Sequence, residues 1–159
     1  MAAAVVADLP ELADVAARTF PLACPASVSA DDIAAFIDEN LSEYRFRGYV
    51  ADPDRRVLVV RDDERMVGYA MLVRSDDGVE LSKIYVLPDS HGAGVSAELM
   101  AAAMDAATEL GVESVWLGVN QRNQRAQRFY AKQGFTVSGT RTFRLGTGIE
   151  NDYVMVRPL

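Results

Sequence analysis

An apolar run from Ile84 to Leu87 leads into a loop with two glycines, which leads into a helix-like stretch. Glycines let backbone N–H groups converge, and a helix N-terminus adds about half a positive charge. This arrangement predicts an anion seat suited to a pyrophosphate, although an ordinary strand-to-helix turn stays an alternative. No P-loop ending follows, and Ala97 stands where a dinucleotide fingerprint has its third glycine.

A second segment combines a helix cap with aromatic residues. Asn123 is of a type favoured at a helix N-cap, and Phe129, Tyr130 and Phe135 follow it. On their own, these aromatic side chains are typical of a core. Three arginines of the segment suit either a phosphate contact or a solvated surface. These are Arg122, Arg125 and Arg128.

Residue counts exclude several classes of protein. The 159 residues, half of them hydrophobic, predict one domain over 1–159. One cysteine, Cys24, allows no intrachain disulfide and no thiolate zinc site, and one histidine, His91, argues against a metal centre or a Ser-His-Asp triad. We therefore expect no metal. No run of about 18 apolar residues and no secretory signal occurs, so we expect a cytoplasmic protein without a membrane partner.

The charge is negative overall and unevenly distributed. A net charge of −7 argues against a nucleic-acid partner. Residues 1–80 hold 16 acids and 8 bases, whereas residues 81–159 hold 7 acids and 8 bases. Either this is a solvated acidic face, or one half of the chain meets a cation and the other an anion.

Two helices are expected before residue 42. Asp8 and Glu11 have the spacing of a capping box, and helical spacing of apolar residues continues to about Phe20. Pro21 then predicts a loop. Ser29 opens a second helix that continues to about residue 41.

The remaining pattern predicts a mixed sheet. A strand, loop, helix and strand over 79–119 sit within an otherwise antiparallel set. We expect an α+β fold with a mostly antiparallel sheet of six to seven strands and about four helices. The expected strands are Ala2–Val6, Val57–Arg61, Met66–Arg74, Val79–Leu87, Val112–Val119, Thr136–Leu145 and Tyr153–Val156, and the later helices are Ala97–Leu110 and Asn123–Gln133.

Taken together, the two segments resemble the GCN5-related N-acetyltransferase (GNAT) superfamily. Its hallmark Asn-x-x-Ala-x-x-Phe-Tyr-x-x-x-Gly-Phe is matched in full from Asn123 to Phe135. Its loop motif, Gln/Arg-x-x-Gly-x-Gly/Ala, is matched with two departures, His91 and Ser96. The resemblance implies the GNAT fold, with a central splayed strand pair.

The end of the chain resembles a narrower group. The run Phe143-Arg144-Leu145-Gly146-Thr147-Gly148-Ile149-Glu150-Asn151-Asp152-Tyr153-Val154-Met155 is similar to the ending of bacterial PaiA-type polyamine N-acetyltransferases. Leu81–Val86 and Trp116–Val119 are also similar. Thr147 and Gly148 stand where that group often has two aspartates.

The resemblance implies acetyl-CoA as co-substrate. The pantetheine arm would pair with the backbone of Ile84 and Val86, and the pyrophosphate would lie on the amides of Gly92 to Ala97. A backbone N–H near Val86 would polarise the thioester carbonyl. The residues implied at the acetyl-CoA site are Ile84, Tyr85, Val86, His91, Gly92, Ala93, Gly94, Val95, Ser96, Ala97, Asn123, Ala126 and Tyr130.

Two catalytic roles follow from the resemblance. Tyr130 stands at the family's proton-donor position, and a phenol with a pKa near 10 is protonated at neutral pH; a core tyrosine is the alternative. Glu80, eleven residues before His91, stands where histone acetyltransferases of the superfamily have a catalytic glutamate. A surface carboxylate, with a water relay as the base, is the alternative for Glu80. We assign Cys24 no covalent role.

The expected acceptor is a small cationic amine such as a polyamine. Glu150 and Asp152 are the expected substrate-binding residues, and Glu39, Glu43 and Glu80 are further acids available for it. Two alternatives are a protein or peptide N-acetyltransferase and a catalytically silent acyl-CoA-binding regulatory domain. A homodimer stays open.

Overall fold

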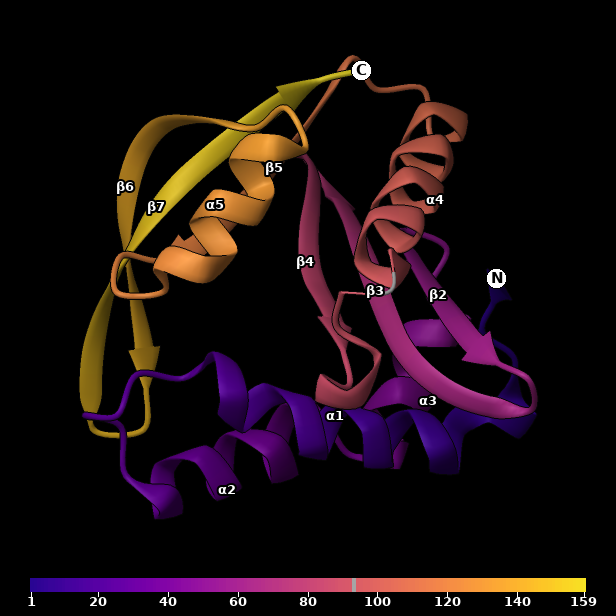
Figure 1. Ribbon diagram of the computed structural model, residues 1–159, viewed down its shortest axis with the longest axis horizontal. Coiled ribbons are helices and arrows are strands. Elements are labelled where there is room, and N and C mark those ends of the chain that lie inside the picture. The colour runs from indigo at the N-terminus through magenta and orange to yellow at the C-terminus, as the bar shows by residue number, and fades with distance from the viewer. Residues whose placement is uncertain (93) are drawn as a thin grey trace.

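A computed structural model describes residues 1–92 and 94–159. In this part of the chain, seven strands form one sheet in the order β1-β2-β3-β4-β5-β7-β6, and five α-helices accompany it (Figure 1). The strands are β1 (Ala2–Ala3), β2 (Arg55–Asp62), β3 (Arg65–Ser75), β4 (Gly78–Val86), β5 (Ser114–Asn120), β6 (Thr136–Leu145) and β7 (Gly148–Pro158). The α-helices are α1 (Leu9–Ala23), α2 (Ala30–Asn40), α3 (Glu43–Ala51), α4 (Val95–Glu109) and α5 (Gln124–Lys132).

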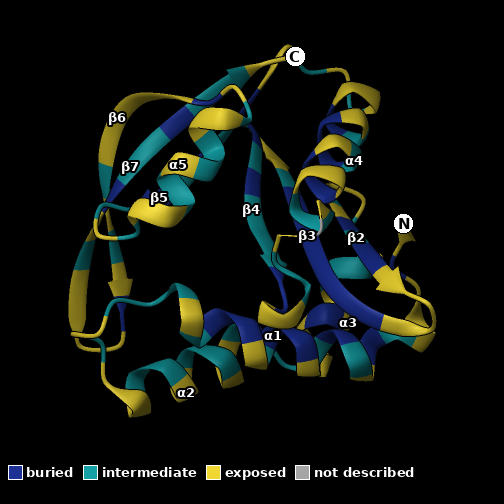
Figure 2. Ribbon diagram, in the orientation of Figure 1, coloured by how far each residue is buried: buried dark blue, intermediate teal, exposed yellow. Residues whose placement is uncertain are grey.

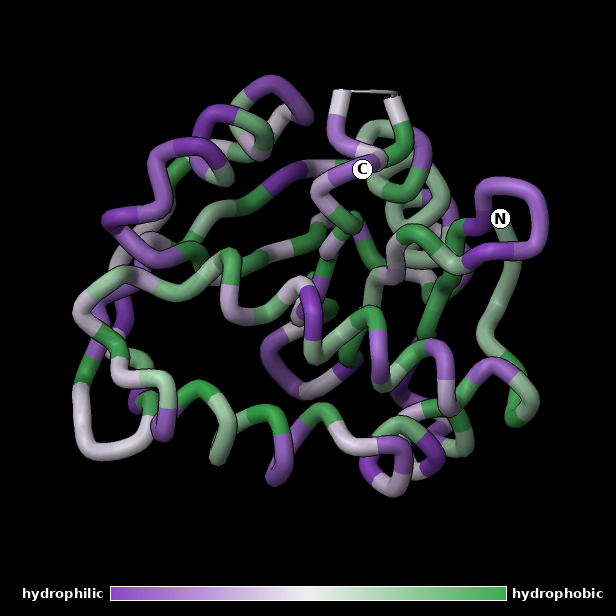
Figure 3. Tube along the Cα trace, turned by 60° about the horizontal axis from the view of Figure 1, so that its bottom comes forward, coloured by the Kyte–Doolittle hydropathy of each residue, from purple (hydrophilic) through white to green (hydrophobic). Residues whose placement is uncertain are grey.

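Helices cover both faces of the first half of the sheet. The buried face of α4 packs on one side, and α1 and α3 pack on the other. All residues of β3 from Met66 to Leu72 are therefore buried, which explains their unbroken apolar run (Figure 2). Hydrophobic segments of the chain lie mainly in the interior, and hydrophilic ones in the outer turns (Figure 3).

The sheet opens at its centre. The parallel strands β4 and β5 pair at two positions only, Val79 with Val115 and Glu80 with Trp116. Beyond Glu80, β4 continues along β3, whereas β5 continues along β7. The expected splayed strand pair is therefore confirmed, and Glu80 lies at the point where the strands part.

A bulge in β4 determines which side chains face the gap. Leu81 pairs with Leu72 and Lys83 pairs with Met71, so Ser82 is the extra residue. The bulge keeps Ile84 and Val86 on the α4 side with Leu81, and it directs Lys83 and Tyr85 to the same face as Glu80.

The predicted α+β class and the mostly antiparallel sheet are confirmed, but three local expectations are wrong. The described residues hold five α-helices rather than about four, because α3 was not predicted. Helix α1 runs through Pro21 to Ala23. Asp8 and Glu11 do not form a capping box; both carboxylates bind Arg61, at 2.7 and 2.6 Å.

Candidate active site

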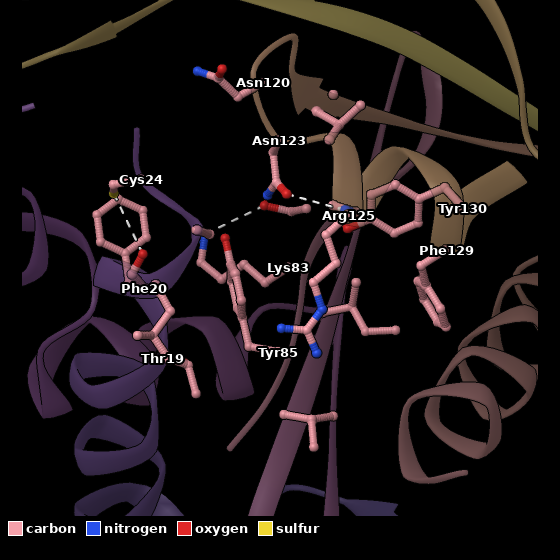
Figure 4. A pocket seen from close by; sticks show the side chains of 18 of the residues that line it. Thr19, Phe20, Cys24, Lys83, Tyr85, Asn120, Asn123, Arg125, Phe129 and Tyr130 are labelled. Atoms are coloured by element: carbon pink, nitrogen blue, oxygen red, sulfur yellow. Dashed lines mark hydrogen bonds between the residues drawn. The ribbon is translucent and has the colours of Figure 1, made fainter. Parts of the chain in front are cut away.

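A cavity of about 570 Å³ lies where β4 and β5 diverge. Side chains from α1 form one wall and side chains from α5 form the opposite wall, with Lys83 and Tyr85 of β4 between them (Figure 4). Most of the predicted site residues line this cavity. They are Glu80, Ile84, Tyr85, Val86, His91, Gly92, Gly94, Ser96, Ala97, Asn123, Ala126, Tyr130, Glu150 and Asp152.

The glycine loop enters α4 through two left-handed residues. Gly92 has φ 82° and Gly94, the N-cap of α4, has φ 79°. Glycine adopts these angles without steric cost. The first-turn amides that follow point out of the helix N-terminus beside the cavity, as an anion seat requires. Ala93 lies outside the described residues, and Val95 packs with its side chain against the core.

The backbone of β4 directs polar groups into the gap. Leu87 donates its N–H to Val67 of β3, at 2.8 Å. Backbone groups of successive residues alternate between the two edges of a strand, so those of Val86 and Ile84 face the opening toward β5. This edge can accept an extended chain such as a pantetheine arm.

His91 connects the loop to α5. Arg125 Nη2 lies 2.6 Å from His91 Nδ1, and His91 Nε2 lies 2.8 Å from the Val86 carbonyl oxygen. A guanidinium can only donate and a carbonyl can only accept, so neutral His91 carries its hydrogen on Nε2. Arg125 therefore lines the cavity while remaining exposed, and both alternatives for it, a phosphate contact and a solvated surface, stay open.

Asn123 and Tyr130 occupy the expected ends of α5. The Asn123 side chain accepts a hydrogen bond from the Ala126 N–H at 3.1 Å and so caps the helix. Tyr130 lies a further turn along, with its ring against Phe129 and Phe135, at centroid distances of 5.6 and 5.9 Å.

The two tyrosines of the cavity remain protonated over a wide pH range. Burial, together with repulsion from Tyr85, raises the pKa of Tyr130 well above its ordinary value. Burial also raises the pKa of Tyr85 to about 12. Tyr130 can therefore donate a proton but is a poor proton acceptor at neutral pH.

Arg141 of β6 binds two of the predicted acids. Its Nε donates to Asp152 at 3.2 Å, and its Nη1 lies 3.7 Å from Glu80. Its guanidinium also lies over the Trp116 ring, at 5.4 Å from the centroid. Burial raises the pKa of Glu80 and of Asp152, and Arg141 opposes that rise in both.

Glycine at position 118 makes room for Arg141. A Cβ at Gly118 would overlap the guanidinium of Arg141. We expect Gly118→Ala to displace Arg141 and lower the free energy of unfolding by about 1–3 kcal/mol, because the buried Asp152 carboxylate and the half-buried Glu80 carboxylate lose their cation. Gly139→Ala is the control, since a Cβ there meets no atom within 4 Å.

Denaturant titrations at two pH values will check this prediction. A carboxyl with a raised pKa in the folded state favours folding at low pH and costs stability as pH rises through its unfolded pKa. The Gly118→Ala defect will thus be larger at pH 8 than at pH 5. An equal defect in Gly118→Ala and Gly139→Ala would contradict the role of Gly118.

The other predicted acids are distributed differently. Glu150 is near Ser27 of the α1–α2 loop, whose hydroxyl donates to it at 3.5 Å and accepts from Arg122 at 3.0 Å. Glu39 and Glu43 are not among the residues that line the cavity, and their part in substrate binding stays a prediction.

Several cavity residues were not predicted from the sequence. No role was predicted for Lys83 from the sequence, although a lysine inside an apolar strand is a signal of a functional position. Arg141 and Gly118 gave no signal, because their contact joins strands far apart in the sequence. The same holds for three aromatic side chains that line the cavity, which are Phe20, Phe36 and Phe143.

Comparisons with known proteins agree with this geometry. The model of the Acetyltransferase (GNAT) family matches residues 11–135. Proteins of Mycobacterium bovis and Mycobacterium tuberculosis, each described as an uncharacterized N-acetyltransferase, are 61% identical over 153 residues, which is 96% of this chain and 98% of theirs.

Two solved structures share the fold. PaiA N-acetyltransferase from Thermoplasma acidophilum, in complex with coenzyme A, superposes with a TM-score of 0.85 at 21% identity, over 98% of this chain and 96% of its own. The ribosomal-protein-S18-alanine N-acetyltransferase from Escherichia coli gives 0.73 at 21% identity, over 98% and 90%.

Two kinds of feature are absent from the described residues. None of the helices in the described ranges is long and apolar enough to cross a membrane. Residues 1–92 and 94–159 contain no group of three or more His, Cys, Asp or Glu side chains arranged to hold a metal ion.

Proposed function

This chain belongs to the GNAT family of acetyltransferases and is an N-acetyltransferase that uses acetyl-CoA, and from that premise we propose that its acceptor is a small cationic amine. The observation that carries the proposal is the set of acids on the acceptor side of the cavity, Glu80, Glu150 and Asp152. Lys83 and Arg141 face the same space, so the acids exceed the cations by one.

We propose the following arrangement of acetyl-CoA. The pantetheine arm pairs with Ile84 and Val86 at the open edge of β4, and the pyrophosphate lies on the amides at the start of α4. The Val86 N–H then polarises the thioester carbonyl. The support is the outward-facing backbone of β4 and the left-handed glycines of the loop.

Tyr130 is the proposed proton donor to the CoA thiolate. Its raised pKa keeps it protonated at neutral pH, and it lines the cavity opposite β4. The acceptor ammonium must lose a proton before attack, and Glu80 or a water relay was predicted for that step. The single-domain organisation, a cytoplasmic location and a homodimer also stay predictions.

A polyamine is the first candidate within the class. The fold shared with PaiA from Thermoplasma acidophilum and the ending from Phe143 to Met155 favour it. A peptide N-terminus is the second candidate. It is favoured because Phe20, Phe36 and Phe143 form an aromatic wall that suits an apolar side chain, and because Arg141 offsets part of the acidic charge.

A CoA-release assay over polyamines, amino acids, aminoglycosides and peptides tests the proposal. We expect turnover of spermidine, with a KM that rises with ionic strength because charge attraction at partly exposed sites is screened. Glu150→Gln should raise that KM by about two- to fivefold. Glu109→Gln is the control, because Glu109 is exposed on α4 and does not line the cavity.

Two outcomes would change the conclusion. Turnover of a peptide N-terminus with none of spermidine, spermine or diamines would replace the polyamine with the second candidate. Acetyl-CoA binding without turnover of any amine would favour the catalytically silent alternative.

A further inference from the structure

Lys83 lies in the part of the cavity that also contains Glu80, Tyr85 and Asp152, which we call the acceptor half. It follows the Ser82 bulge, which directs it to the face shared by Glu80 and Tyr85. Figure 4 shows Lys83 between Phe20 and Cys24 on the side of α1 and Tyr130 on the side of α5. Its neighbour in the chain is Ile84, whose backbone faces the gap. In the arrangement of acetyl-CoA proposed above, a side chain at this position would lie beside both the thioester and the incoming amine.

The Lys83 amine is weakly paired. Its Nζ donates to Ser82 Oγ at 3.4 Å, and no carboxylate of the described residues lies within 4.0 Å of it. Glu80 is the acid that attracts it, but the Glu80 carboxylate also faces Arg141. Arg55 of β2 repels it.

The charged and titratable groups around Lys83 come from four other elements. Arg55 lies on β2, Cys24 at the end of α1, Arg141 on β6 and Asp152 on β7. Desolvation is the largest influence on the amine, and it lowers the pKa of Lys83 to about 8. Burial also raises the pKa of Cys24, to about 11, so the thiol stays neutral beside it.

A neutral lysine is a better proton acceptor for an alkylammonium than a carboxylate is. An alkyl amine has a pKa near that of free lysine, about 10.4. Proton transfer is favoured when the pKa values of donor and acceptor are close and the acceptor is neutral at the working pH. Glu80 remains the weaker base even with its pKa raised by burial, since the ion pair with Arg141 favours its charged form.

We propose that Lys83 is the general base, which contacts the acceptor ammonium and takes its proton. The inference rests on the proposed acetyl transfer to an amine. The geometric support for this role is the position of Lys83 in the cavity, beside the open edge of β4 and opposite Tyr130. The bulge at Ser82 sets that position.

The proton and electron movements balance. The ammonium gives one proton to Lys83 Nζ, and the freed lone pair forms a C–N bond to the thioester carbonyl carbon. The C–S bond breaks, and the thiolate takes the Tyr130 proton. The nitrogen gives its surplus proton to the Tyr130 phenolate as the amide forms, and Lys83 releases its proton to solvent, so both residues return to their starting states. The net products are an acetylated amine, CoA thiol and one proton.

The pH dependence of kcat/KM tests this role. In the wild type, kcat/KM will rise with pH as Lys83 loses its proton, with a limb near pH 8. Lys83→Met keeps an apolar body, and Lys83→Arg keeps the charge but accepts no proton. Both will lower kcat/KM by about a hundred- to ten-thousandfold and move the limb to the acceptor's own pKa. Lys132→Met, on the exposed face of α5, will behave like the wild type.

The chain offers a direct second readout, because Lys83 and Lys132 are its only lysines. Protein labelled with [ε-¹³C]lysine will give two side-chain signals, which Lys132→Arg assigns. We expect the Lys83 signal to titrate near pH 8, well below the ordinary lysine pKa of about 10.4.

The outcomes separate the two proposals. A Lys83 signal that titrates at the ordinary lysine pKa, about 10.4, overturns the base role, whatever the activity. Turnover that keeps its pH limb in Lys83→Met overturns it too, and leaves the acetyl transfer standing. Absence of turnover on every amine tested overturns the proposed acceptor class and the base role with it. A limb that remains near pH 8 in Glu80→Gln but is lost in Lys83→Met supports Lys83 over Glu80.

Discussion

Tyr130→Phe will leave acetyl-CoA affinity unchanged and lower kcat by about a hundred- to ten-thousandfold, the range for loss of a general acid. The substitution removes only the hydroxyl, so the ring keeps its contacts with Phe129 and Phe135. The CoA thiolate then has to take its proton from water. Stopped-flow or steady-state CoA release gives kcat, and calorimetry gives the affinity.

The control and the pH profile distinguish a proton donor from a packing residue. Tyr44→Phe changes a side chain that is 80% exposed, and it will match the wild type. Because the pKa of Tyr130 is raised by burial, its loss should lower activity evenly from pH 6 to 9 without removing a limb. Turnover of Tyr130→Phe at the wild-type rate would assign Tyr130 to the core and leave water as the donor.

Gly94→Glu will abolish measurable acetyl-CoA binding. A glutamate at φ 79° strains the backbone at the N-cap of α4, and its carboxylate repels the pyrophosphate where the helix amides would bind it. The defect should appear as loss of the calorimetric binding signal rather than as a change in kcat alone.

Two further variants separate charge from strain. Gly48→Glu is the matched control, because a Cβ at Gly48, on the exposed face of α3, meets no atom within 4 Å. Gly94→Ala adds the backbone strain without the charge, and it will weaken binding less than Gly94→Glu. Unchanged affinity in Gly94→Glu, with a circular dichroism spectrum like that of the wild type, would refute the cofactor placement.

Local signals in the sequence predicted the cap of α5 and the backbone of the glycine loop well. Asn123 caps α5 as expected from its residue type, and the Ala126 amide it binds is three residues away. The glycines at 92 and 94 adopt the left-handed angles that a tight strand-to-helix turn requires. Such features depend on neighbours within a few residues, which a sequence displays directly.

The wrong expectations depend on partners distant in the sequence. The carboxylates of Asp8 and Glu11 have the spacing of a helix cap, but Arg61 and the Met66 N–H, fifty or more residues later, bind them instead. Helix α3 was not predicted because it buries a single residue fully, Phe46, so its sequence carries little helical periodicity.

The acceptor half was predicted least well, and Lys83 shows why. Strict alternation in β4 would place Lys83 with Val79 and Leu81, facing the core. The Ser82 bulge reverses that alternation, so that Lys83 faces the cavity instead. A charged residue at an apparently buried strand position is thus a sign of a bulge as well as of a site.

The short junction of β4 and β5 has a mechanical consequence. Two residue pairs join the halves β1–β4 and β5–β7–β6 within the sheet. A bound pantetheine arm would add backbone hydrogen bonds along the gap that the polypeptide leaves open between these halves. At a hundred times its dissociation constant, a ligand that binds only the folded chain adds about 2.7 kcal/mol to stability. Amide protons along Gly118–Asn120 and Ile84–Val86 should then exchange much more slowly once acetyl-CoA is bound in this gap. The rigidity of the sheet would therefore increase with the concentration of acetyl-CoA.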